Sequence, residues 1–99
     1  MGYNNLMANH RIYTLNTASA TRVTPAGKHS GMDITIQNLE PDITVFVGGS
    51  GVTNTNFGYR LLPGAAISFE LPGSDSLFVA TETDGAQIAV LNIGLEVGN

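Results

Sequence analysis

"VFVGGSGVTNTNFGYRLLPGAAISFEL", residues 45–71, decides the fold class of this chain. It begins with a β-branched run that stops at two glycines, passes through Thr, Asn and Gly, and ends in a second alternating run. Strand-forming runs bounded by such turn residues are typical of antiparallel sheets. In residues 65–71 apolar side chains alternate with Ser and Glu, so this run is predicted to bury one face and expose the other.

The same pattern recurs along the whole chain. Further runs, bounded by Gly, Pro, Asn or Asp, occupy residues 10–15, 19–24, 32–38, 43–49, 58–62, 76–82 and 86–94. Short strands at intervals of roughly 8–12 residues indicate a sandwich or a barrel. No window of a dozen residues has helical periodicity, so we expect at most one helical turn, and residues 52–58 are the place where one would lie. We therefore predict an all-β fold, an antiparallel β-sandwich or jelly-roll-like barrel of about eight short strands.

The inward-facing positions of these runs define a predicted core. Its members are Ile34, Ile36, Val45, Val47, Ile67, Phe69, Leu77, Val79, Ile88 and Val90. The run 86–94 is the most apolar, and we expect both of its faces to be buried. Residues 1–9 are polar and aperiodic. We predict an extended N-terminal arm there and a single β-sandwich domain over residues 10–99.

The composition excludes several classes of protein. The chain has 99 residues, which fits one domain, and 12% of them are charged. Its formal net charge is −4 with four basic residues, so it lacks the basic surface that nucleic-acid binding requires. It contains no cysteine, which excludes disulfides and cysteine-ligated metals. No apolar run approaches the roughly 20 residues of a membrane span, and the N-terminus lacks the pattern of a signal peptide.

The glycine-rich turn at residues 48–51 raises the question of phosphate binding. A P-loop places a lysine after its last glycine, and a dinucleotide fingerprint needs a third spaced glycine and a following helix. Neither is present here. We interpret Gly48 and Gly49 as a corner where a positive φ or a bulge lets the chain leave a strand. We expect backbone groups of the turn that lack a partner in a strand to form hydrogen bonds with the side chains of Ser50, Thr53 and Asn54.

The side chains that carry chemistry are scattered. His10 and His29 have no GxSxG nucleophile motif near them. Asp75 and Asp84 lie at the two turns of one predicted hairpin, without the DxD-type spacing of calcium sites. We therefore predict no catalytic, cofactor-binding or metal-binding residues, and no enzymatic activity.

An ordered set of short elements runs through residues 32–94. It comprises Asn38, Val45, Val47, Gly48, Gly49, Ser50, Val52 and Thr53, then Leu62, Pro63, Gly64, Ile67, Phe69, Glu70 and Leu71, then Leu77, Phe78 and Val79, and last Ile88, Val90 and Leu91. This set resembles small β-domains of tailed-bacteriophage virion proteins. Domains of that kind occur in capsid decoration (cement) proteins, head fibres, and tail or baseplate components.

The resemblance implies a structural protein of the virion. We expect a capsid decoration protein that binds across the seams of the major capsid shell as a homo-oligomer, with a trimer favoured. It would lie on the capsid exterior after assembly in the host cytoplasm, with no nucleic-acid or membrane partner. The alternative is a tail, fibre or baseplate module that binds another virion protein or a host glycan.

Association requires apolar and aromatic anchors on the surface. The predicted interface residues are Tyr3, Leu6, Met7, Ile12, Tyr13, Phe57, Tyr59 and Arg60. A carbohydrate-binding module, a different class of protein, needs an exposed aromatic platform, and this chain has no tryptophan and few aromatic residues.

Overall fold

The computed structural model describes residues 5–24, 31–71 and 76–96. In this part of the chain it shows eight strands and no helix. The strands are β1 (Asn5–Thr14), β2 (Thr21–Arg22), β3 (Met32–Asn38), β4 (Val45–Gly48), β5 (Tyr59–Leu61), β6 (Ala66–Leu71), β7 (Phe78–Thr81) and β8 (Gln87–Glu96). Each of the eight predicted runs overlaps one of them, so the predicted all-β fold is confirmed.

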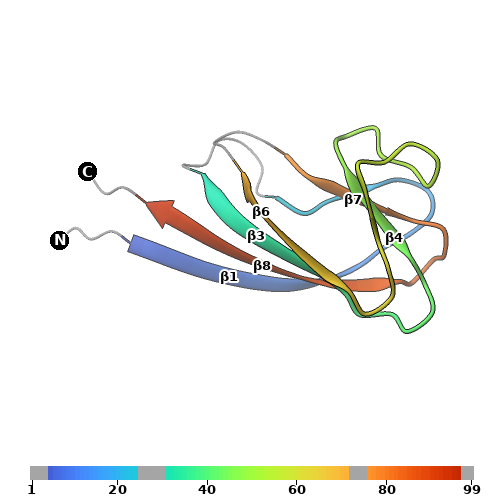
Figure 1. Ribbon diagram of the computed structural model, residues 1–99, viewed down its shortest axis with the longest axis horizontal. Coiled ribbons are helices and arrows are strands. Elements are labelled where there is room, and N and C mark those ends of the chain that lie inside the picture. The colour runs from blue at the N-terminus through green and yellow to red at the C-terminus, as the bar shows by residue number, and fades with distance from the viewer. Residues whose placement is uncertain (1–4, 25–30, 72–75, 97–99) are drawn as a thin grey trace.

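The strands form two four-stranded sheets that pack face to face (Figure 1). Sheet A has the order β1-β8-β3-β6, and sheet B has the order β2-β7-β4-β5. Neighbouring strands run antiparallel in both sheets. This is the strand order of a jelly-roll sandwich, in which a long antiparallel hairpin is folded over on itself.

The strand β1 extends further toward the N-terminus than the alternating pattern does. It begins at Asn5 and pairs with β8 over ten residues, up to Glu96. Residues 5–9, for which the sequence predicts an arm, are therefore backbone of this strand, and residues 1–4 lie outside the described part. The first residue of β1, Asn5, and the last of β8, Glu96, therefore lie at the same end of sheet A (Figure 1).

The period of two places one face of each strand inside the sandwich. In β3, Ile34 and Ile36 are fully buried, whereas Asp33 and Gln37 are exposed. Ile36 lies opposite Val90 of β8, so the buried side chains of neighbouring strands share one face. The alternation predicted from the sequence of residues 32–38 is confirmed.

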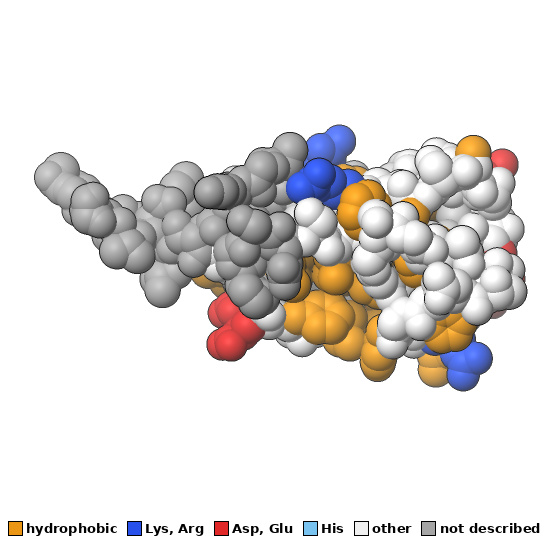
Figure 2. All heavy atoms as spheres, turned by 90° about the horizontal axis from the view of Figure 1, so that it is seen from above, with side chains coloured by type: hydrophobic (Ala, Val, Ile, Leu, Met, Phe, Trp, Pro, Cys, Tyr) orange, Lys and Arg blue, Asp and Glu red, His pale blue; other side chains and the backbone are white. Residues whose placement is uncertain are grey.

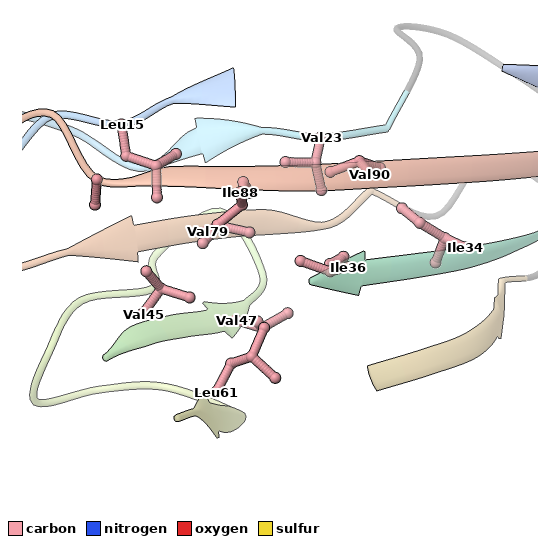
Figure 3. Packing of buried hydrophobic residues seen from close by; sticks show 11 residues of the cluster. Leu15, Val23, Ile34, Ile36, Val45, Val47, Leu61, Val79, Ile88 and Val90 are labelled. Atoms are coloured by element: carbon pink, nitrogen blue, oxygen red, sulfur yellow. The ribbon is translucent and has the colours of Figure 1, made fainter. Parts of the chain in front are cut away.

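The core lies between the two sheets (Figure 3). Seven predicted members are buried there: Ile34, Ile36, Val45, Val47, Val79, Ile88 and Val90. Ile67, Phe69 and Leu77 are partly buried and pack against this cluster. The cluster also includes Leu15, Val23 and Leu61, which are not among the predicted core residues. Removing one such aliphatic side chain from water contributes about 1.5–3 kcal/mol.

Asn38 is a polar side chain with no exposed surface. Its Nδ2 group donates to the carbonyl oxygens of Ile43 at 2.7 Å, Leu61 at 3.1 Å and Leu62 at 3.2 Å. Its Oδ1 accepts the N–H of Glu40 at 2.9 Å. One side chain thereby joins the turn after β3 to the end of β5, and so connects sheet A to sheet B.

The glycine-rich turn folds over the outer face of sheet B. Val52 from this turn is 6% exposed and packs with Phe46 and Ala80 in a second, smaller cluster. The ring of Phe57 lies 5.0 Å from the ring of Phe46, centroid to centroid. The turn thus protects the back of sheet B from water.

One detail of this turn differs from the sequence-based expectation. The described glycines with positive φ are Gly31, Gly64 and Gly85, so of the two alternatives for Gly48 and Gly49, a positive φ or a bulge, the positive φ is wrong. Residues 52–58 contain bends and no helical turn, which agrees with the expectation of at most one such turn. The reason for glycine at position 48 is space, because an added Cβ would lie 3.1 Å from Cγ2 of Val52 and 3.3 Å from the backbone nitrogen of Gly58.

Replacing Gly48 by alanine is expected to lower the free energy of unfolding by about 1 kcal/mol, because the buried side chain of Val52 and the backbone at Gly58 must move to admit a methyl group. Gly49→Ala is the matched control, since a Cβ added at Gly49 would meet nothing within 4 Å. It should be neutral or slightly stabilising. Denaturant titrations of both variants measure the difference, and equal values would contradict the steric explanation.

Candidate interface surfaces

The outer face of sheet A is the surface of sheet A that points away from sheet B. Exposed aliphatic side chains gather there, with Ile12 on β1 59% exposed, and Leu91 and Ile93 on β8 41% and 37% exposed. Ile12 lies directly opposite Ala89, which continues the apolar stripe across the two strands. Scattered apolar residues are normal on a surface, but a contiguous apolar stripe marks a contact site.

This stripe corrects one expectation from the sequence. The run 86–94 was expected to bury both faces, and Ile88 and Val90 are indeed buried. Leu91 and Ile93, however, lie on a face that no described part of the chain covers. The apolar composition of the run therefore reflects one face turned to the core and one turned to the surroundings.

A shallow hollow of about 330 Å³ lies on the outer face of sheet A. Its wall is made by side chains of three adjacent strands: His10, Ile12, Thr35, Gln37, Ala89 and Leu91. The floor is formed by small Ala89, while larger side chains on β1 and β3 stand on either side of it. The surface is thus grooved along the strands and is mainly apolar.

Uncharged polar side chains flank the stripe. The hydroxyl groups of Thr35 and Ser68 lie 2.7 Å apart on neighbouring strands β3 and β6. On the other side, Nε2 of Gln87 donates to Oγ1 of Thr14 at 3.2 Å. Figure 2 shows another side of the molecule, on which charged side chains are also few and hydrophobic ones gather near the middle.

A second group of predicted interface residues lies on and beside β5, at the edge of sheet B. Phe57 and Tyr59 are 41% and 45% exposed, and Arg60 is exposed opposite Phe46. Part of the Phe57 ring packs against Phe46 of the same chain and is therefore not exposed to a partner. This group is separate from the outer face of sheet A, since β5 belongs to the other sheet.

The remaining predicted interface residues come from the N-terminal segment. Tyr3 lies outside the described residues, and Leu6 and Met7 are described as backbone of β1 only. Tyr13 faces inward, where it packs against the core, and the guanidinium of Arg11 lies 4.7 Å from the centre of its ring. The structure therefore places Ile12 on the outer face of sheet A and Tyr13 on the opposite one.

The loop between β1 and β2 is fastened to the turn before β8. The backbone N–H of Thr17 donates to Oδ1 of Asp84 at 2.7 Å. Oδ1 of Asn16 accepts from the N–H groups of Ala18 and Ser19 at 3.0 and 3.3 Å. The bond from Thr17 favours the charged carboxylate and lowers the pKa of Asp84 below its usual value.

This bond predicts a pH-dependent contribution to stability. Because the pKa of Asp84 is lower in the folded chain, its contribution is present above the unfolded pKa, about 3.9, and is lost as pH falls through the folded pKa. Asp84→Asn should therefore be less stable than the parent chain at pH 7, and the difference should shrink toward pH 3. Denaturant unfolding at both pH values tests this, with Asp42→Asn, at an exposed turn, as the control.

The described residues contain no group of three or more His, Asp or Glu side chains placed to hold a metal ion. His10 is exposed on the outer face of sheet A, and His29 and Asp75 lie outside the described residues. The turn at residues 48–58 surrounds a small hollow lined largely by glycine, with no helix following it in the described chain. No described helix is long and apolar enough to cross a membrane.

Comparison with known proteins yields a similarity of fold. A scan against protein-family models and a search of curated proteins returned no match. Among solved structures, the chain is similar to one from work on Bacillus endospore appendages, described as a family of disulfide-linked pili. The TM-score is 0.52 and the sequence identity is 13%, over 97% of this chain and 93% of that one. At this identity the match shows a shared fold, and the present chain has no cysteine with which to form such links.

Proposed function

We propose that this chain is a structural subunit that assembles with further copies of itself. The observation that carries the proposal is the exposed apolar stripe of Ile12, Leu91 and Ile93 on the outer face of sheet A. Burying such a stripe against another protein surface is favourable, at about 25 cal/mol per Å² of apolar area. The similarity of fold to a pilus protein is compatible with a role in assembly.

Within this class, we place the chain on the virion of a tailed bacteriophage, as a capsid decoration protein that stabilises the shell as a homotrimer. The support is the ordered set of elements between Asn38 and Leu91 that resembles such domains. A stiff sandwich with an apolar face suits a role of this kind, because it strengthens a seam by burying surface and makes no covalent bond. A tail, fibre or baseplate module is the second candidate, supported by the same resemblance.

Light scattering of the purified chain tests self-assembly. We expect a mass that is a multiple of 10.4 kDa, with three copies for the trimer. Leu91→Ser should weaken association, whereas Leu62→Ser, a matched change of an exposed leucine beside β5, should not. A single-copy mass at high micromolar concentration would overturn the proposal.

The position on a particle requires a second experiment. Purified chain is mixed with phage capsids that lack their decoration protein, and binding and resistance to heat are measured. Binding to tails but not to capsids would select the tail module instead.

A further inference from the structure

Sheet A has two open edges in the described part of the chain. The strand β1 borders β8 alone, and β6 borders β3 alone. An open edge presents unpaired N–H and C=O groups, and proteins usually protect it with proline, lysine or a very short strand. β1 has ten residues, a length of about 33 Å, and contains neither proline nor lysine.

The strand directions allow one edge to join the other. Because neighbouring strands of sheet A alternate in direction, β1 and β6 run in opposite directions. A second copy shifted sideways, in the same orientation, would therefore bring its β6 antiparallel to β1 of the first. A continuous antiparallel sheet results, and β-strand addition at a sheet edge is a common mode of recognition.

At both open edges, the even-numbered residues are the ones whose backbone N–H groups are free to pair with another strand. The N–H of Leu15 donates to the carbonyl of Ala86 at 2.8 Å, so odd-numbered residues of β1 point their N–H toward β8. Even-numbered residues then point theirs to the open edge. Likewise the N–H of Asn38 donates to the carbonyl of Ala65 at 2.9 Å, which leaves the even-numbered residues of β6 at its open edge.

The side chains of these even-numbered residues also lie on the same face of sheet A in both strands. Even-numbered residues of both strands carry their side chains on the outer face of sheet A, as Ile12 and Ser68 do. Directly opposed residues of an antiparallel pair share a face, so pairing even with even keeps the sheet surface continuous.

The charges of the two edges are opposite in sign. β1 carries the cationic Arg11 and no described acidic side chain. β6 carries Glu70 and no basic side chain, and Asp33 of β3 lies directly opposite Glu70 on the same face. Pairing β1 with β1 of another copy would instead offer Arg11 no acidic partner, which makes that arrangement less favourable.

We propose that, in the assembly inferred above, β1 of one copy pairs with β6 of the next, with His10 opposite Glu70. This register also places Ile12 opposite Ser68 and Thr14 opposite Ala66. It rests on the proposed self-assembly and specifies its contact. Such a head-to-tail contact generates a ring if the rotation between copies closes and a filament if it does not. The outer face of sheet A then continues from copy to copy, with the apolar stripe of β1 and β8 repeated in each.

Engineered cysteines test this pairing directly, because the chain has none of its own. The double variant Ile12→Cys/Ser68→Cys should oxidise into a ladder of covalent dimers, trimers and longer species on a non-reducing gel. Within one copy two strands separate these positions, a distance of about 14 Å, which exceeds the roughly 7 Å limit for a disulfide. The control pair Ile12→Cys/Thr53→Cys, with the second cysteine on the turn over sheet B, should give no ladder.

The outcomes separate the pairing from the assembly itself. Efficient dimers from Ile12→Cys alone would indicate pairing of β1 with β1 and overturn the proposal. Absence of a ladder in a variant whose mass by light scattering is still oligomeric overturns the pairing and leaves self-assembly intact. A monomeric parent chain overturns both.

Charge exchange tests the register. His10→Glu should weaken association about fivefold, since two carboxylates then oppose each other directly across the pair. Glu70→Lys reverses the charge on the other strand. Combining the two in one chain should restore it. Asp33→Lys makes the same change of charge one strand further from the edge and should change association less than twofold. Failure of the combined variant to recover would overturn the register.

Discussion

Replacing Asn38 by aspartate is expected to lower the free energy of unfolding by about 3 kcal/mol. The Nδ2 group of Asn38 donates to three carbonyl oxygens, and aspartate would place a carboxylate oxygen against them instead. Leaving a buried acceptor without its donor costs about 1–3 kcal/mol, and burying an unpaired charge costs more. Since domains of this size are stable by about 5–15 kcal/mol, the change removes a large share of the total.

The neighbouring residue supplies the control. Gln37→Glu makes the same amide-to-acid change on the outer, exposed side of the same strand. It should alter stability by less than about 0.5 kcal/mol. Urea unfolding of both variants at pH 7 measures the contrast, and similar losses would show that the bonds of Asn38 do not hold the two sheets together.

Ile36→Ala is expected to cost about 2–5 kcal/mol, because Ile36 has no exposed surface and its truncation leaves a cavity between the sheets. Ile93→Ala removes the same atoms from the opposite face of sheet A, where the side chain is 37% exposed. Its effect should be small in dilute solution and should grow with protein concentration if association buries Ile93. Thermal unfolding at several concentrations separates the two cases, and a loss for Ile36→Ala below about 1 kcal/mol would contradict the assigned core.

The fold was predictable from the sequence because both of its signals are local. Strands such as β3 and β6 alternate apolar and polar residues, and the turns between strands are marked by Gly, Pro, Asn or Asp. The start of β1 lacked such a signal. Residues 5–9 are strand because β8 lies alongside them, a contact between distant segments that no local pattern reports.

The surface was less predictable than the fold. An apolar run has the same sequence pattern whether its second face packs against the core or against a partner. For this reason Leu91 and Ile93 were predicted to be buried. The burial of Asn38 was not predicted, since a polar residue at the end of a strand usually indicates an exposed turn. Pairing the polar outer face of residues 32–38 with β8 would have exposed the first error, but that requires the strand order.

The pairing of β1 with β8 has a consequence for folding kinetics. The first described strand finds its neighbour in the last, so partners such as Asn5 and Glu96 come from opposite ends of the sequence. During synthesis β1 has no strand to pair with in sheet A until β8 has left the ribosome. We expect slow, late closure of sheet A and a period in which nascent chains are exposed to mispairing.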